Sequence, residues 1–186
     1  MTRLMLEGDR RTLAAVAATA GLLARLGTRA AFVGDVARAA WLGELLEAGG
    51  AVDVVVAMGV DSARSIAMVA ADEGFRVDDE EARRAEELDL LPMWWEGEEE
   101  PVRVHVLFAS NALYGRMVRD AVEAEAPSGP VRIVSAEDLA LLVLVAERPG
   151  WEVEVGRIRL RAGDAFDRDR LNRKLVSIGL GRRTLV

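Results

Sequence analysis

The sequence predicts an α/β fold of the α+β kind, with a mixed sheet flanked by helices and a C-terminal helical extension. Apolar residues at helical spacing alternate with short β-branched runs up to about residue 134. From residue 135 onward the apolar spacing is helical throughout. The 186 residues, of which 51% are hydrophobic and 30% charged, suffice to bury one core. We therefore expect a single domain over 1–186, with an α/β core over 1–134 and a helical tail over 135–186.

The first elements are two helices and two strands. Apolar residues recur every three or four positions over 13–24 and stop at Gly27, which predicts a helix with a glycine terminator. The short apolar run 29–33 is typical of a buried strand and turns directly into a second helix, expected over 35–49. The β-branched run 51–58 then predicts a central strand.

The middle of the chain predicts a helix, a hairpin and another helix. A helix is expected over 62–73, and the charged segment 78–89 is either an exposed helix or a mobile loop. Strands over 93–96 and 102–108 are joined by an acidic turn and form a hairpin. The next helix starts at about residue 111 and is expected to continue to about residue 125.

The last part begins with the segment 127–130, whose two prolines and glycine predict a linker. A short strand over 131–134 follows. Ser135 and Asp138 then have capping-box spacing before the apolar run 139–146, so we interpret that run as a buried helix. Two more helices are expected, over 152–161 and 171–178.

Composition narrows the functional classes. The chain has no cysteine, which excludes disulfides, thiolate metal sites and cysteine nucleophiles. The N-terminus carries scattered charges and does not resemble a signal peptide, and the longest apolar run, 139–146, is far shorter than the ~20 residues that span a bilayer. We expect no membrane association and a cytoplasmic location.

The charge pattern argues weakly against nucleic-acid binding. The net charge is −7, and acidic clusters at 78–81 and 96–100 would repel a phosphate backbone. Arginine is locally dense over 157–173 and at Arg182 and Arg183, which is either a weak basic patch or a solvated helical face.

The order of several short motifs resembles the nucleotidyltransferase superfamily. A strand ending in Val33-Gly34-Asp35 and the strand 52–56 resemble the family's Gly-Gly or Gly-Ser turn and Asp-x-Asp strand. Gly74-Phe75 matches a frequent Gly-Phe, and 104–107 falls where a strand presents a third carboxylate. The segment 134–139 is similar to the Val-Ser-Pro-Glu-Asp-Leu segment of the branch with AbiE-type toxins and uncharacterised bacterial proteins. The resemblance covers roughly residues 10 to 180.

The resemblance implies a turn that holds a nucleoside triphosphate and three carboxylates that hold two magnesium ions. This chain departs from that pattern. Asp35 follows Gly34 where phosphate should approach, the Asp-x-Asp pair is Ala51-x-Asp53, and His105 stands at the third carboxylate position. The family's lysine after Glu-Asp-Leu is replaced by apolar residues such as Leu142. One carboxylate of three does not hold two hard cations that want several oxygen ligands.

The candidate site residues are therefore Asp53 and His105 as catalytic groups and Gly34 and Asp35 as the nucleotide-binding turn. Asp35 is interpreted as a helix N-cap, with metal binding as the alternative. Asp53 is costly to bury unless it is paired or faces a cleft. His105 lies on the strand face opposite Val104 and would neighbour Asp53 if that face fronts the cleft. The pair would be either a structural hydrogen bond or an acid-base unit.

Aromatic residues suggest a possible interface. Trp94 and Trp95 are adjacent on a strand, so they point to opposite faces, and we expect one in the core and the other at an interface rather than stacked on bases.

Our leading hypothesis is a degenerate, catalytically inactive nucleotidyltransferase-like protein that acts as a binding or regulatory scaffold, without a cofactor. The alternatives are an active enzyme that uses magnesium and a nucleoside triphosphate on RNA or protein, and a homo-oligomer or subunit with a protein partner and no small ligand. The resemblance alone suggests a toxin-antitoxin link.

Overall fold

The computed structural model describes residues 3–97, 100–147 and 149–181. The chain divides into two compact units, of which one is Leu4–Val134 and the other is Ser135–Val186 with Met1–Arg3. Within the described ranges, no helix is long and apolar enough to cross a membrane.

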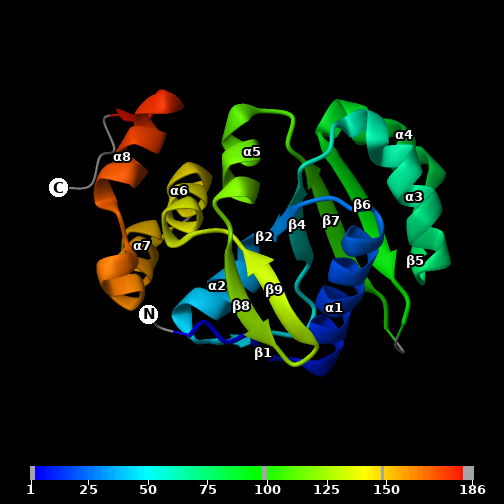
Figure 1. Cartoon of the computed structure of the whole chain (residues 1–186), viewed down its shortest axis with the longest axis horizontal. Helices are drawn as coiled ribbons and strands as arrows, with labels where there is room; N and C mark the ends of the chain where they lie inside the picture. The colour runs from blue at the N-terminus through cyan, green and yellow to red at the C-terminus, as the bar shows by residue number, and fades with distance from the viewer. Residues whose placement is uncertain (1–2, 98–99, 148, 182–186) are drawn as a thin grey trace. The chain divides into compact units, whose positions relative to one another are not determined.

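A seven-stranded mixed sheet organises the Leu4–Val134 unit (Figure 1). From one edge to the other its strands are β5 (Phe75–Arg76), β6 (Leu90–Trp95), β7 (Val102–Phe108), β4 (Val52–Val56), β2 (Ala30–Phe32), β9 (Gly129–Ile133) and β8 (Val122–Ala126). The β4–β7 and β2–β9 pairs are parallel, and the other neighbours are antiparallel. At the far edge the N-terminal stretch adds backbone hydrogen bonds, since the Leu6 amide donates to the Glu125 carbonyl at 2.8 Å.

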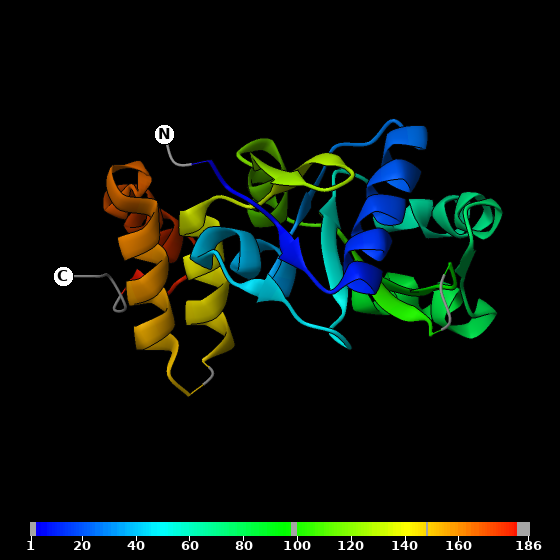
Figure 2. The same cartoon turned by 90° about the horizontal axis from the view of Figure 1, so that it is seen from below.

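Short strands and five helices complete this unit. Strands β1 (Glu7–Gly8) and β3 (Leu45–Leu46) form a separate parallel pair. The helices are α1 (Arg10–Arg25), α2 (Gly34–Leu42), α3 (Ala63–Asp72, after a 3-10 turn at Val60–Ser62), α4 (Asp79–Leu88) and α5 (Ala112–Arg119). Helix α1 lies against β7 and β4 (Figure 2), and α5 against β4 and β2. Helices α3 and α4 pack together, with α4 against β6.

The strand pattern predicted the core face of the sheet. Val102, Val104, Val106 and Phe108 alternate along β7 and are all buried, because successive side chains point to opposite faces. The intervening Arg103, His105 and Leu107 therefore occupy the other face.

Three sequence-based expectations were wrong. The second helix ends at Leu42 rather than near Gly49, because Gly43 adopts a left-handed conformation with φ 67°. The helix expected to about residue 125 ends at Arg119, and 122–126 is strand β8. The segment 127–130 is not a linker but the tight turn of the β8–β9 hairpin, in which Ala126 pairs with Gly129. The segment 122–126 forms a strand because it pairs with β9. Its own composition, rich in Ala and Glu, favours a helix, so the local sequence does not predict the strand.

The segment 78–89 is a helix, not a loop. Asp78 caps α4 by accepting hydrogen bonds from the Glu80 and Glu81 amides. Asp89 ends the helix in the left-handed conformation with φ 51°.

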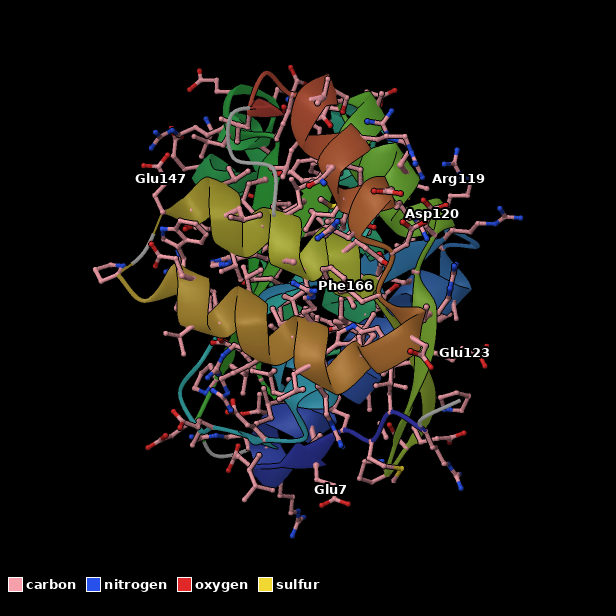
Figure 3. All side chains as sticks on the ribbon, turned by 90° about the vertical axis from the view of Figure 1, so that its left-hand side faces the viewer. Glu7, Arg119, Asp120, Glu123, Glu147 and Phe166 are labelled. Carbon is pink, nitrogen blue, oxygen red and sulfur yellow. The ribbon has the colours of Figure 1, made fainter. Side chains whose placement is uncertain are left out.

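The unit from Ser135 consists of helices α6 (Ala136–Ala146), α7 (Trp151–Ala162) and α8 (Arg168–Ser177), with a 3-10 turn at Gly163–Ala165. Helices α6 and α7 lie side by side (Figure 3). The predicted cap is confirmed, because the Asp138 amide donates to Ser135 Oγ at 3.3 Å. Ser135 Oγ also donates to Asp138 Oδ2 at 2.9 Å, and Lys174 Nζ of α8 donates to Asp138 Oδ1 at 2.5 Å.

Candidate functional site

The Gly34 turn and the Asp53 side chain are in direct contact. The Val33 amide donates to the Asp53 carbonyl at 2.9 Å, which holds the end of β2 beside the start of β4. Gly34 has φ 55°, and a Cβ atom built on it would lie 2.7 Å from Asp53 Oδ2. A side chain at position 34 would therefore be strained in its backbone and would also collide with the carboxylate. Glycine is the residue that lets this turn approach Asp53.

Asp53 and His105 form a pair, an arrangement that the sequence predicted only if the strand face of His105 fronts the cleft. They are register partners on the parallel strands β4 and β7, so their side chains share one sheet face. His105 Nδ1 lies 2.7 Å from Asp53 Oδ1, and the side chains are 22% and 32% exposed respectively. An ionised carboxylate only accepts hydrogen bonds, so the imidazole donates through Nδ1. His105 Nε2 is buried and has no hydrogen-bond partner among the described residues.

Asp35 does not cap the helix, which corrects the sequence-based interpretation. Val33 occupies the N-cap position of α2, and Asp35 lies in the first turn, where its negative charge interacts favourably with the helix dipole. Its carboxylate lies toward Gly50, because a Cβ built there would be 3.4 Å from Asp35 Oδ2. It lines a pocket of about 90 Å³ with Arg38 and Glu47. The structure thus brings Gly34, Asp53 and His105 together and directs Asp35 toward a different loop.

The side chains at this site do not fit a pair of magnesium ions. Ala51 stands two positions before Asp53, and the partner strand contributes His105 rather than a carboxylate. No group of three or more His, Cys, Asp or Glu side chains suited to a metal ion occurs in the described part of the chain. Magnesium prefers several oxygen ligands in near-octahedral geometry, and one carboxylate beside an imidazole does not supply them. The catalytic and nucleotide-binding roles of these residues remain predictions.

Two arginines lie beside Trp94 on the same sheet face as His105. Of the two adjacent tryptophans, Trp95 is buried and Trp94 is partly exposed. Trp94 has two basic neighbours, because Arg76 and Arg103 lie opposite it on β5 and β7. Their guanidinium carbons are 5.7 Å and 5.4 Å from the centroid of the Trp94 ring. These contacts cross strands, so the local sequence around Trp94 does not show them.

Comparison with known proteins identifies the fold. No protein-family model matches the sequence, and no curated protein matches it. Among solved structures, the chain is similar to an antigenic nucleotidyltransferase-like protein from Paracoccidioides brasiliensis, with a TM-score of 0.60 and 11% identity over 95% of this chain and 90% of that chain.

Two structures of the antibiotic-resistance factor ANT(2'')-Ia are also similar. One gives a TM-score of 0.54 at 13% identity, covering 92% of each chain. The other, in complex with adenylyl-2''-tobramycin, gives 0.52 at 15% identity, covering 94% of this chain and 99% of that chain. At such identities the similarity is one of fold, since one fold serves many functions. The chain therefore has a nucleotidyltransferase-like fold.

Proposed function

We propose that this chain is a nucleotidyltransferase-like binding or regulatory scaffold that does not carry out metal-dependent nucleotidyl transfer. The observation that carries the proposal is the pair formed by Asp53 and His105, with 2.7 Å between His105 Nδ1 and Asp53 Oδ1. The one carboxylate that remains on the site strand is thereby bonded to a side chain of the chain itself.

The chemistry of nucleotidyl transfer explains why this pair matters. Two hard cations activate the attacking hydroxyl and neutralise the leaving pyrophosphate, and carboxylates hold both ions in place. Here one oxygen of Asp53 contacts His105, and the other lies against the Gly34 turn. The same site remains suited to binding, because the turn keeps its close approach to β4 and both side chains are partly exposed.

An active magnesium-dependent enzyme is the second candidate, and one observation favours it. Asp53 is 32% exposed and lies directly beside the Gly34 turn, at the place that the family resemblance assigns to the nucleotide. One neighbour in fold, ANT(2'')-Ia, was solved with adenylyl-2''-tobramycin. Under this candidate Asp53 would hold the metal, Asp35 would have to turn away from Gly50 to join it, and RNA or protein would accept the nucleotide. A link to toxin-antitoxin systems rests on the sequence resemblance alone.

Calorimetric titration separates the two candidates. The protein is titrated with ATP, GTP, CTP and UTP, with magnesium and with EDTA, and each mixture is assayed for transfer of labelled nucleotide to RNA or protein. Asp53→Asn is the test variant. Asp72→Asn is the matched control, because Asp72 is an exposed aspartate at the end of α3 and its substitution changes the charge equally.

The two candidates give opposite results. The scaffold proposal expects no transfer and no nucleotide binding that requires magnesium in any of the three proteins. Magnesium-dependent binding that Asp53→Asn abolishes and Asp72→Asn retains would establish the enzyme instead.

A further inference from the structure

We propose that a pocket beside the Asp53–His105 pair binds a small phosphate-bearing molecule, with arginine side chains supplying the positive charge. This arginine-tryptophan pocket has a volume of about 210 Å³ and is lined by Arg11, Gly49, Gly50, Trp94, Pro101, Val102 and Arg103. This inference rests on the proposed function, a scaffold that binds without a metal, and names the class of ligand that the scaffold binds.

The strand register places the pocket next to the candidate site. His105 pairs with Asp53 on one side and with Pro92 on the other, and Arg103 pairs with Trp94. Directly paired residues share a sheet face, and Arg103 and His105 are two positions apart on β7. Their Cα atoms are therefore separated by about 7 Å along the strand. A phosphate at Arg103 would leave the rest of a ligand within reach of His105.

Two arginines supply the charge. Arg11 pairs with Glu100, whose side chain is 75% exposed, and such surface ion pairs are weak and open readily. An incoming phosphate would have to displace Glu100, which belongs to the acidic cluster 96–100, from Arg11. Arg103 contacts the Trp94 ring, and no hydrogen bond or ion pair joins its side chain to another residue in the described ranges. Guanidinium groups bind phosphate through paired N–H donors, which makes arginine suited to this role.

Trp94 gives the pocket a flat aromatic wall. Its ring lies between Arg76 and Arg103, and Arg76 Nε donates to Glu96 Oε1 at 2.6 Å. Arg76 on β5 and Arg103 on β7 hold the partly exposed indole in place. Arg103 covers part of the ring, so a planar base can stack on Trp94 once Arg103 turns from the indole to a phosphate.

Size and charge favour a small ligand over a nucleic acid. Pockets for drug-sized ligands span about 300–1,000 Å³, so 210 Å³ suits a phosphate with an attached sugar or base edge. The net charge of −7 opposes the approach of a long polyanion. The shared chemistry is a phosphate group, and a nucleotide adds a base for Trp94.

The test uses the full chain in EDTA, titrated with inorganic phosphate, AMP and ATP and followed by calorimetry and tryptophan fluorescence. Arg103→Gln and Arg11→Gln are the test variants. Arg84→Gln is the matched control, because Arg84 is an exposed arginine on α4 with only a 3.9 Å contact to Glu87. Circular dichroism checks that every variant folds.

We expect AMP or ATP to bind without metal, and Arg103→Gln and Arg11→Gln each to weaken binding about tenfold while Arg84→Gln leaves it unchanged. Arg103→Lys keeps the charge without the paired N–H donors, so its affinity should lie between the affinities of the wild type and of Arg103→Gln. If AMP binds more tightly than inorganic phosphate, the ligand of the pocket is a nucleotide. If AMP and phosphate bind equally well, the pocket recognises the phosphate group alone. An equal loss in Arg84→Gln, or tighter binding of a short single-stranded oligonucleotide than of AMP, would overturn the proposal.

The failures of the two proposals are distinguishable. Binding that appears only with magnesium and disappears in Asp53→Asn overturns the proposed function. Absence of any binding in EDTA and in magnesium overturns only the arginine-tryptophan pocket and leaves the scaffold proposal with a protein partner or a second copy.

Discussion

Replacing Lys174 by methionine should destabilise the helical unit more than any exposed substitution in α8. Lys174 is the one lysine of the chain, and it is buried at 6% exposure. Its Nζ lies 2.5 Å from Oδ1 of Asp138, which is fully buried. The variant Lys174→Met keeps the approximate shape of the side chain but removes the cation, and a buried carboxylate stays behind.

The structure sets the size of this effect. Breaking a buried ion pair by removing one partner costs about 3–5 kcal/mol, because an uncompensated charge remains in the core. Ser135 Oγ still donates to Asp138 Oδ2 in the variant, so the lower end, about 3 kcal/mol, is expected. In the double variant Asp138→Leu with Lys174→Met both charges of this pair are removed, and we expect it to recover about 2 kcal/mol relative to Lys174→Met alone.

Urea unfolding followed by far-ultraviolet circular dichroism measures these free energies. Arg173→Met is the matched control, because Arg173 is the preceding residue of α8, 71% exposed, with a loose 3.7 Å contact to Asp167. It should cost less than about 0.5 kcal/mol. Acylation of primary amines, read by mass spectrometry, should also spare Lys174 in the folded chain. A loss below about 1 kcal/mol in Lys174→Met, or a double variant as unstable as the sum of both singles, would refute the reasoning.

Two further predictions concern the Gly34 turn and the start of α1. Gly34→Ala should destabilise the chain by at least about 1 kcal/mol more than Gly27→Ala, as measured by urea unfolding. Both glycines have positive φ, but only a Cβ at Gly34 would meet Asp53. Equal losses of stability in the two variants would contradict the predicted collision. The hydrogen bond from the Thr12 amide lowers the pKa of Asp9 in the folded chain. The ionised Asp9 therefore stabilises the fold above the unfolded-state pKa of this carboxyl, and this contribution is lost as pH falls through the lower folded-state pKa. The stability of wild type relative to Asp9→Asn should therefore decrease as pH is lowered through this range, and a difference that does not change with pH would exclude this role.

Much of the candidate site could be predicted from the sequence. The alternation of Val104, His105 and Val106 fixed the face of the histidine, and an ionisable residue within a β-branched run marked Asp53 as a side chain that needs a partner. The turn glycine was visible because a strand led through Gly34 directly into a helix. Asp35 was misplaced because helix boundaries are uncertain by one or two residues, and an N-cap depends on one position.

The parts that were missed depend on contacts between segments distant in the sequence. Strand β8 has a helix-favouring composition and becomes a strand through its ladder with β9. Arg76 and Arg103 reach Trp94 from the strands on either side. Lys174 was a recognisable signal, as the one lysine among many arginines, but its partner Asp138 lies 36 positions earlier.

The sequence by itself determined most of the helices and strands, the helical tail and the strand face on which His105 lies, because periodicity acts locally. The contact between Asp53 and His105, which are 52 positions apart, depended on the register of β4 with β7. Only the tertiary structure decided the order of the seven strands, the β8–β9 hairpin and the cationic surroundings of Trp94. The physical reason is that strand pairing joins segments far apart in the sequence. The hydrogen bonds of two strands can form in several registers, and the burial of a common core selects one of these registers.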